Sequence, residues 1–492
     1  MKLATVAAAL VATSLLSIGP ARAAGWLAPG DAGLRDDIER LVDEEVIDLP
    51  LMAWPIHADG LRAELDAIPE DAKLSASQQA AIARLRQRLE PDRPIEYRLA
   101  GTNRPSPVRT FDDGPREDAE IGVLADWEQG RWSARLDLAV VADPSDAQTV
   151  RPDGSYVEGR FGNWSVTAGW LERWWGPGWE GSALLGTAAR PVGAISVDRA
   201  VMQPFDTKWL RWLGPWTINA FMGAMENNRQ DRDHPLLMGL RFAFRPLNGL
   251  EIALERTAQW CAEGLPCDLN AFWNVLVGKD NAGENVNPED EPGNQLFGYS
   301  ARWSSPIGSA PYAFYFQQIG EAGSQDKIPV PVQRLSVQGI EIWGGRHRGT
   351  PWRLYFEYAD TTCHVAAEEY FDCAYNNGIF NVEGYRYRGR PVGHGLDGDG
   401  KSYSLGLQLR GALGADWQVL ARRLEINRGG VVPDTSHSLS PEPLDAWEAQ
   451  VRANFEALGG RVSVGLAGEK LEPLSGEDQT KGRLFLTYSH DF

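Results

Sequence analysis

Segments in which apolar and polar residues alternate recur from about Ala119 to the end of the chain, separated by turn residues. In residues 446–456, aromatic and aliphatic side chains face one way, while charged side chains such as Glu448 and Arg452 face the other. A soluble β-sandwich would bury those charges in its core at a cost of several kcal/mol each. A water-filled lumen accepts them. The pattern therefore predicts an all-β transmembrane fold, a large antiparallel outer-membrane β-barrel.

The final residues, 482–492, alternate in the same way, with Leu484 and Leu486 on one face and Arg483 and Phe485 on the other. As the last strand of a soluble sandwich, the alternative reading, this stretch would leave a sticky aromatic edge. In a closed barrel it pairs with the first strand, and no edge remains. Roughly sixteen to eighteen alternating segments fit between 111 and the end, at about 21–24 residues per strand and turn.

Residues 1–23 have the features of a Sec-type signal peptide. Lys2 follows the initial methionine, residues 3–18 are apolar or small, and Ala21-Arg22-Ala23 is an Ala-x-Ala cleavage site. We expect cleavage near Ala23. No other window holds 18 uninterrupted apolar residues, which excludes a helical membrane protein. Together with the alternating strands, the export signal predicts the bacterial outer membrane as the location.

Composition agrees with a barrel. The 19 tryptophans suit aromatic girdles where an apolar band meets water. A mean hydropathy of −0.34 resembles a soluble protein, because lumen-facing and lipid-facing residues average out along each strand. The net charge of −19 argues against nucleic acid as a partner, and solvated acidic loops are its simplest explanation.

Residues 24–110 predict a small helical subdomain. Apolar residues recur at helical spacing in 31–47, a second helix capped by Ser75 or Ser77 ends at Pro91 and Pro94, and a shorter helix lies around 61–68. So small a unit cannot bury a large core alone, so we expect it to pack against the periplasmic end of the barrel. The predicted division is a signal peptide at 1–23, the helical subdomain at 24–110 and the barrel at 111–492.

Four longer polar stretches are candidate extracellular loops, and at least one of them is expected to fold inward and close the lumen. They are residues 261–293, 320–332, 361–400 and 429–443. The cysteines lie in two of these loops, and two local disulfides are the favoured pairing in an oxidising compartment. Neither pair has metal-ligand spacing, so no metal site is expected. The candidate disulfide residues are Cys261 with Cys267 and Cys363 with Cys373.

The common catalytic motifs are missing. The chain has no G-x-S-x-G elbow, no P-loop, no H-E-x-x-H and no G-x-G-x-x-G after a strand. The run 397–400 lacks the third acidic ligand and the later Glu of a calcium loop, so it is read as an acidic turn. No spacing selects a Ser-His-Asp or paired-carboxylate site. We therefore expect a protein that is not an enzyme and needs no cofactor.

The segment 169–199 concentrates aromatic and charged residues. Tryptophans crowd around Gly176-Pro177-Gly178, and Arg173, Arg190 and Arg199 lie among or after them. Flat aromatic faces stack on sugar rings, and Arg or Glu side chains contact hydroxyls or uronic-acid carboxylates. An aromatic girdle with a tight Gly-Pro-Gly turn explains the same residues. On physical grounds alone both interpretations stay open.

This segment resembles the hallmark of the capsule-assembly (Wzi) family of outer-membrane proteins, with Trp-Gly-Pro-Gly at 175–178 followed by small residues and Ala-Arg-Pro at 189–191. The run from Leu49-Pro50 to Trp54-Pro55 is similar to an early element of that family. A third similarity is the Tyr-Arg-rich run 384–390 with His394 and Asp397. The chain departs from the family pattern at Ala188-Ala189, where Asn is more usual, and in its acidic stretch 279–292.

The resemblance implies an 18-stranded outer-membrane barrel with a periplasmic helical bundle, acting like a lectin that attaches capsular polysaccharide or exopolysaccharide to the cell surface. Further implied partners are outer-membrane lipid or lipopolysaccharide and, during biogenesis, the barrel-assembly machinery. A diffusion porin and an outer-membrane hydrolase are the alternatives. Inward Arg and Asp residues also commonly form an ion-pair lattice in a barrel lumen. The candidate carbohydrate-binding residues are Arg173, Trp174, Trp175, Arg190, Arg199, Arg386, Arg388, His394 and Asp397.

Overall fold

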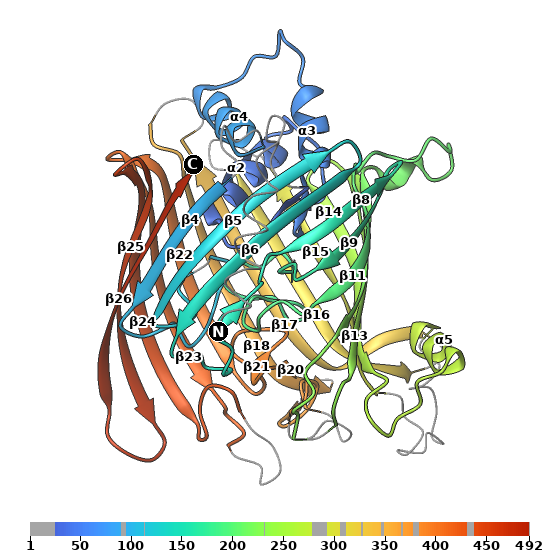
Figure 1. Cartoon of the computed structure of the whole chain (residues 1–492), viewed down its shortest axis with the longest axis vertical. Helices are drawn as coiled ribbons and strands as arrows, with labels where there is room; N and C mark the ends of the chain where they lie inside the picture. The colour runs from blue at the N-terminus through green and yellow to red at the C-terminus, as the bar shows by residue number, and fades with distance from the viewer. Residues whose placement is uncertain are drawn as a thin grey trace, which may run out of the picture.

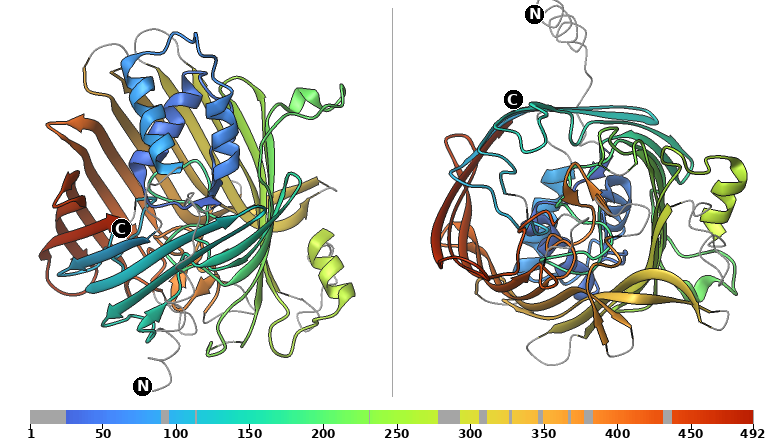
Figure 2. Two further views of the ribbon diagram at one scale, coloured as in Figure 1. Left: turned by 45° about the horizontal axis from the view of Figure 1, so that its top comes forward. Right: turned by 90° about the horizontal axis from the view of Figure 1, so that it is seen from below.

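The chain folds into a closed antiparallel β-barrel whose interior is occupied by its own helix and loops (Figures 1 and 2). The structure is a computed structural model. It describes residues 25–89, 95–112, 114–230, 232–277, 293–305, 311–325, 328–345, 349–365, 368–376, 383–430 and 437–491. The predicted signal peptide and Phe492 lie outside these ranges.

The barrel closes where β26 (Gln479–Asp491) pairs with β4 (Ile95–Thr102), so that Tyr488 lies opposite Leu99. Two short strands, β7 (Val150–Arg151) and β19 (Glu368–Tyr370), are additions, because β6 also pairs directly with β8, and β18 with β22. Among the described residues this leaves eighteen barrel strands, which confirms the predicted fold class. The remaining sixteen are β5 (Ala119–Gln129), β6 (Trp132–Ala142), β8 (Tyr156–Phe161), β9 (Trp164–Gly169), β11 (Ala194–Arg199), β12 (Trp216–Ala224), β13 (Leu236–Leu247), β14 (Leu250–Trp260), β15 (Gly293–Ser305), β16 (Tyr312–Gln325), β17 (Ile328–Gly344), β18 (Trp352–Val365), β22 (Lys401–Ala412), β23 (Ala415–Ile426), β24 (Leu444–Ala457) and β25 (Gly460–Pro473).

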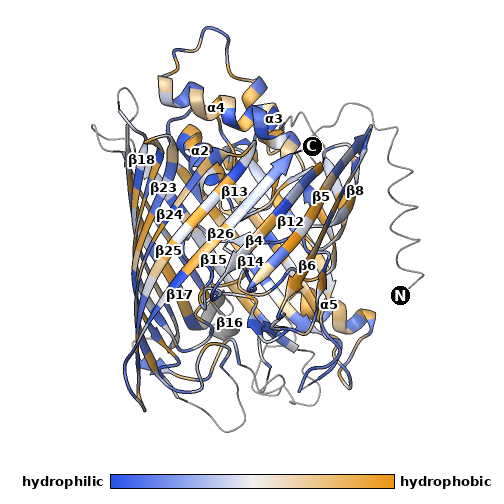
Figure 3. Ribbon diagram, turned by 60° about the vertical axis from the view of Figure 1, so that its left-hand side comes forward, coloured by the Kyte–Doolittle hydropathy of each residue, from blue (hydrophilic) through white to orange (hydrophobic). Residues whose placement is uncertain are grey.

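The strands alternate as the sequence pattern predicts. On β24, Trp447 is 51% exposed on the outer wall, whereas its neighbour Glu448 is 5% exposed in the lumen. On β26, Leu484 and Leu486 face outward and Arg483 is buried inside. Hydrophobic and hydrophilic residues accordingly alternate along the ribbons of the wall (Figure 3). Period-two patterning therefore gives an apolar outer surface and a charged interior.

The barrel begins earlier than the predicted boundary at 111. Strand β4 starts at Ile95, and its Tyr97 and Leu99 face outward while Arg98 bonds lumen carboxylates of β5 and β6. Residues 103–118, which join β4 to β5, carry no strand of the barrel, and Phe111 among them is buried. This irregular connection separates β4 from the regular run of strands, which is why the pattern alone placed the first strand too late.

Three N-terminal helices gather at one end of the barrel: α2 (Ala32–Asp43), α3 (Ala58–Asp66) and α4 (Ala76–Leu89). Figure 1 shows α3 and α4 above the rim and α2 below them, within the wall. Ser75 caps α4, because its hydroxyl accepts from the Gln78 N–H and the Gln78 side chain accepts from the Ser75 N–H. Among the described residues, no helix is both long and apolar enough to cross a membrane.

Connection lengths orient the barrel. At the helical end, β5 ends at Gln129 and β6 begins at Trp132. At the opposite end, β14 ends at Trp260 and β15 begins only at Gly293. Short turns face the periplasm and long loops face outward in outer-membrane barrels. By that rule we infer that α2, α3 and α4 face the periplasm and the long loops face outward, and the two ends of the barrel are named accordingly.

The two disulfides join Cys261 to Cys267 and Cys363 to Cys373, which confirms both predicted pairs. The first lies in the loop before helix α5 (Leu269–Val277), which sits outside the wall near the extracellular end (Figure 2). The second pins the extracellular end of β18 to residues just beyond β19. Each disulfide therefore closes a short loop at the end where the long connections gather.

Candidate functional site

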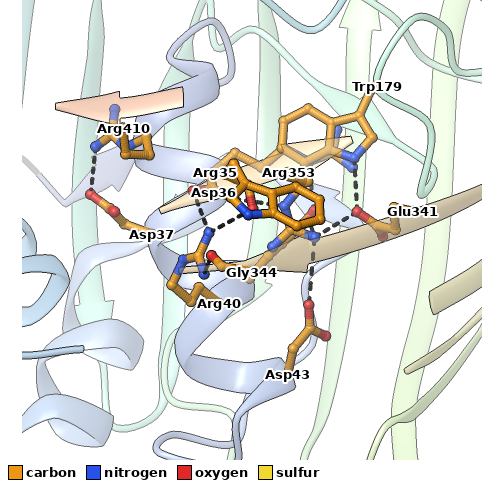
Figure 4. A network of polar contacts seen from close by, with 12 residues as sticks. Arg35, Asp36, Asp37, Arg40, Asp43, Trp179, Glu341, Gly344, Arg353 and Arg410 are labelled. Carbon is orange, nitrogen blue, oxygen red and sulfur yellow. Dashed lines mark hydrogen bonds and ion pairs between the residues drawn. The ribbon is translucent and has the colours of Figure 1, made fainter. Parts of the chain in front are cut away.

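A lattice of ion pairs seats helix α2 inside the barrel (Figure 4). Arg353 of β18 donates from Nε to Asp36 and from Nη1 to Glu341 of β17, both at 2.6 Å. Arg302 of β15 binds both carboxylate oxygens of Asp43, at 2.6 and 2.8 Å. The charged face of α2 is therefore buried against lumen arginines, and the helix closes the periplasmic half of the lumen.

The Trp-Gly-Pro-Gly run belongs to residues 170–193, here called the inner segment, which contacts α2. Arg35 of α2 donates to the carbonyls of Pro177 and Gly178, at 2.6 Å each. The same guanidinium lies 3.9 Å from the ring centroid of Trp179, within the range of a cation–π contact. Helix α2 and the inner segment thus form one unit inside the barrel.

A carboxylate of the wall holds the turn of the inner segment. Glu357 of β18 accepts from the backbone N–H groups of Trp179, Glu180 and Gly181, at 2.7, 3.1 and 3.0 Å. It also accepts from the Tyr315 hydroxyl at 2.7 Å. Three consecutive amides converging on one carboxylate form a concave anion site, which here is filled by the protein itself. The inner segment is therefore fastened to the wall as well as to α2.

Trp174 and Trp175 anchor this segment and do not present open faces. They form β10 (Trp174–Trp175), which pairs with β2 (Ala53–Trp54), and each is 1% exposed. Trp174 also packs edge-on against Phe111, with ring centroids 5.4 Å apart. Their neighbour Arg173 stacks 4.3 Å from the Phe221 ring, and burial lowers the pKa of Arg173 to about 10. In the described structure these three candidates pack the interior.

The plug loop (residues 383–400) closes the extracellular half of the lumen. Its β20 (Arg386–Tyr387) pairs with β21 (Arg390–Pro391). Arg386 holds Asp397 through two bonds of 2.7 Å, from Nε and Nη2. His394 accepts from the Leu396 N–H at Nδ1, and the backbone N–H of His394 donates to the Tyr375 hydroxyl at 2.8 Å. The expectation that a long loop folds inward is confirmed.

Two groups of the plug loop titrate far from their ordinary range. Burial and then the nearby Arg422 lower the pKa of His394 to about 3, so its imidazole is neutral at physiological pH. Burial is the largest influence on the pKa of Asp397 and would raise it, but the Arg386 guanidinium, His437 and the hydrogen bonds to the carboxylate together hold that pKa below the usual value. Arg386, His394 and Asp397 therefore form one buried cluster that fixes the loop.

Arg190 and Arg388 meet at a second place, the arginine pocket, which opens among the loops of the extracellular end. Arg109, Arg116 and Arg390 join them; Arg390 belongs to the Tyr-Arg-rich run 384–390, whereas Arg109 and Arg116 lie in no recognisable motif. The Tyr-Arg-Tyr-Arg-Gly-Arg run at 385–390 was the one local sign of this cationic cluster. The lining residues are Ser106, Pro107, Arg109, Arg116, Glu117, Ser145, Asp146, Ala188, Arg190, Tyr387, Arg388, Arg390, Pro391 and Gly395.

Charge pairing divides the arginines of the pocket into two kinds. Arg190 is fully engaged, with two bonds of 2.7 Å to Asp153 and one of 2.6 Å to Asp146, and Arg116 binds Glu172. Arg388 and Arg390 make no ion pair within the described part of the chain. The pocket therefore carries two guanidinium groups, those of Arg388 and Arg390, that have no ion-pair partner in direct contact among the described residues, although Glu117 and Asp146 also line it.

Arg199 stands apart from both clusters. It ends β11 near the short periplasmic turn between β8 and β9, pairing with Trp164 across the sheet. Its guanidinium stacks 3.8 Å from the Trp216 ring and donates to the carbonyls of Gln203 and Trp216. The nine candidates thus fall into four places: the packed inner segment, the plug loop, the arginine pocket and this periplasmic rim.

An outer-membrane β-barrel filled by its own helix and loops, with a cationic pocket at its outer end, defines a plugged surface protein of the bacterial outer membrane. The chain belongs to the capsule assembly protein Wzi family, whose model matches residues 111–479. The family predicted from the sequence is thereby confirmed, and the motifs at 175–191 and 384–397 lie within the matched residues.

Two comparisons agree with this assignment. An uncharacterized 55.8 kDa protein of the cps region of Klebsiella pneumoniae is 31% identical over 351 residues, 70% of this chain and 67% of that relative. The solved structure of Wzi from Escherichia coli, described as an outer-membrane protein involved in group 1 capsule assembly and a carbohydrate-binding β-barrel, superposes with a TM-score of 0.82. That match covers 95% of this chain and 100% of the other, at 24% identity, and shows a shared fold.

Proposed function

We propose that this protein binds an exported acidic polysaccharide at the outer face of the cell and aids its attachment or assembly into a capsule or slime. The observation that carries this proposal is the arginine pocket, placed at the extracellular end of a lumen closed by the plug loop. The solved relative described as carbohydrate-binding and the family's role in capsule assembly support it.

The chemistry of the pocket favours a sugar that carries carboxylates. Arg388 and Arg390 lie in a chain of net charge −19, so their clustering runs against the overall sign. A guanidinium group offers a planar fork that matches a carboxylate with two parallel hydrogen bonds. A uronic-acid residue would therefore supply the missing counter-charges, and the hydroxyls of neighbouring sugars would bond Ser106 or Ser145.

The candidate residues take different roles in this proposal. Arg388 contacts the polymer directly, whereas Arg190, which is held by Asp153 and Asp146, shapes the wall of the pocket. Arg386, His394 and Asp397 position the plug loop that presents the pocket. The packed inner segment with Arg173, Trp174 and Trp175 closes the lumen beneath it, and Arg199 takes no part in binding.

The same structure argues against the two alternative functions. Helix α2, the inner segment and the plug loop occupy the lumen, so an open diffusion channel is not supported, and purified protein is expected to show no steady conductance in a planar bilayer. No catalytic role is proposed for the buried carboxylates, because each is already held by protein groups. Glu158, for example, binds the His57 ring at 2.7 Å and accepts from the hydroxyls of Ser133 and Ser165, both at 2.6 Å. Labelling of the purified protein by a serine-reactive probe would contradict this.

Export and insertion complete the proposal. We expect an exported chain with this apolar outer wall to be cleaved near Ala23 and to be inserted by the barrel-assembly machinery. Its wall would then contact lipid or lipopolysaccharide. N-terminal sequencing of the mature protein tests the first of these, with Ala24 as the expected first residue.

The deciding experiment is deletion of the gene, with quantification of polysaccharide in the cell-bound and released fractions. If the protein attaches finished polymer, the total stays constant and material moves into the medium. Complementation with Arg388→Ala combined with Arg390→Ala should reproduce that shift, whereas Lys470→Ala, which removes an exposed cation outside the pocket, should restore retention. Unchanged fractions in the deletion strain would refute the proposal.

A further inference from the structure

Helix α5 lies against the outside of the barrel wall, away from the lumen (Figures 1 and 2). It follows the Cys261–Cys267 loop, and Asp268 caps it by accepting from the Ala271 N–H at 2.7 Å. Its sequence, LNAFWNVLV, contains no ionisable residue. An uncharged helix on the lipid-facing side of a transmembrane barrel needs a physical explanation, because a surface helix in water normally carries a charged face.

The inner face of α5 packs on residues of the outer wall. Val275 and Ala271 are buried, and Val275 belongs to one apolar cluster with Met238 of β13 and with Ala258 and Trp260 of β14. These wall residues would otherwise face lipid, because their neighbours in the strands, such as Gln259, point into the lumen. The helix is therefore fixed to the wall by apolar packing along two strands.

Arg256 of β14 sets the height of the helix along the wall. It lies on the outer face, since its strand neighbours Glu255 and Thr257 are buried in the lumen, and its Nη1 donates to the Leu276 carbonyl at 3.1 Å. A bare arginine on the lipid face of a barrel is unfavourable in proportion to its depth. The C-terminal turn of α5 thus contacts Arg256. Leu254 lies two residues earlier in β14 on the same outer face and is 48% exposed.

The outer face of α5 is an apolar stripe. Leu269, Trp273 and Val277 lie at i, i+4 and i+8 and so share one face, and they are 78%, 57% and 56% exposed. Because the helix reaches the level of Arg256, this stripe continues the apolar outer surface to which Leu254 belongs. Asn270 and Asn274 are the polar residues of the helix.

We propose that α5 is an interfacial helix embedded in the outer leaflet of the outer membrane, with its stripe of Leu269, Trp273 and Val277 in contact with lipid acyl chains. Its position at the extracellular end places Trp273 where an amphipathic aromatic ring is favoured, at the boundary between headgroups and hydrocarbon. The helix shields Arg256 from lipid and fixes how deep this side of the barrel sits. This inference goes beyond polysaccharide binding and does not depend on it.

The test places an environment-sensitive fluorophore on the stripe of the full-length protein. Both disulfides use all four cysteines, so Trp273→Cys provides a single thiol for a nitrobenzoxadiazole label, with one dye per chain verified by mass spectrometry. Val277→Cys is a second probe on the same face, in case the first variant fails to fold. Glu477→Cys, in the exposed turn between β25 and β26 at the same end of the barrel, is the matched control in water.

The labelled proteins are reconstituted in phosphatidylcholine vesicles that contain doxyl-labelled acyl chains, and quenching is compared with quenching by aqueous iodide. We expect the probes at 273 and 277 to lose most of their emission to the acyl-chain quencher and to resist iodide, with the reverse at 477. Iodide quenching at 273 and 277 equal to that at 477 would overturn the proposal. Protection from both quenchers, with elution as an oligomer, would also overturn it in favour of a contact with a second copy of the chain.

Discussion

Arg386 and Asp397 form a two-bond ion pair inside the plug loop, with both donor–acceptor distances at 2.7 Å and both side chains almost completely buried. The Asp397 carboxylate also accepts from the backbone N–H groups of Gly398 and Ser438, each at 2.9 Å. One carboxylate thus joins two turns of the plug loop and a residue of the loop that follows β23. The pair therefore holds the plug loop in its closed arrangement.

Replacing Asp397 with Asn should loosen the plug loop. The substitution leaves the Arg386 guanidinium buried without a counter-charge, and breaking one side of a buried pair costs about 3–5 kcal/mol. Faster proteolysis within residues 383–400 of the folded protein in detergent is the measurement. The double variant Arg386→Met with Asp397→Leu removes both charges and should recover part of the loss. Equal proteolysis of wild type and Asp397→Asn would contradict the role given to this pair.

His394 makes the plug loop sensitive to acid. Its pKa falls from an ordinary 6.5 to about 3 in the folded loop because it is buried, with Arg422 as a further cause. The opened loop therefore binds a proton that the closed loop does not, so closure is fully stable above about pH 6.5 and weakens as pH falls toward 3. Proteolysis of the loop should rise over that window, and His394→Gln should flatten the rise. An equal rise of loop proteolysis with falling pH in His394→Gln would show that another group is responsible for the acid sensitivity.

Glu357 should keep the lumen closed. Glu357→Leu leaves the N–H groups of Trp179, Glu180 and Gly181 without their acceptor, and each buried unsatisfied group costs about 1–3 kcal/mol. The inner segment should then detach from the wall in part of the population, and conductance steps should appear in a planar bilayer. Glu456→Leu, at a carboxylate that is 77% exposed, is the control that should stay silent. A silent Glu357→Leu barrel would mean that α2 and the plug loop suffice to close the lumen.

Local patterns in the sequence predicted the wall well and the interior poorly. Alternation such as Trp447 followed by Glu448 shows which side chains face lipid, because a strand repeats every two residues and a lumen tolerates charge. The cysteine pairs were predictable because each pair is close in the chain. The start of β4 was missed because the irregular stretch 103–118 separates it from the other strands.

The interior depends on contacts between distant segments. The charges of 31–47 look like the solvated face of a surface helix, and only the fold brings Arg302 and Arg353 to Asp43 and Asp36. The roles of Trp174 and Trp175 were equally hidden, because an aromatic ring suits both sugar stacking and core packing. The arginine pocket draws its lining from several separate loops, so no single stretch of sequence contains it.

The pocket itself leads to a prediction about ligand charge. Purified protein should bind polygalacturonate, a polymer of uronic acids, more tightly than neutral dextran, because Arg388 and Arg390 lack ion-pair partners among the described residues. A hydrogen bond to a charged group contributes about 1.5–3 kcal/mol, so Arg388→Ala should weaken polygalacturonate binding about tenfold or more. Binding should also weaken as salt rises, since the pocket is open to solvent. Isothermal titration calorimetry with both polymers measures these effects, with Lys470→Ala as the control. Equal affinity for dextran and polygalacturonate would show that the polysaccharide is recognised through its hydroxyls and not through its charge.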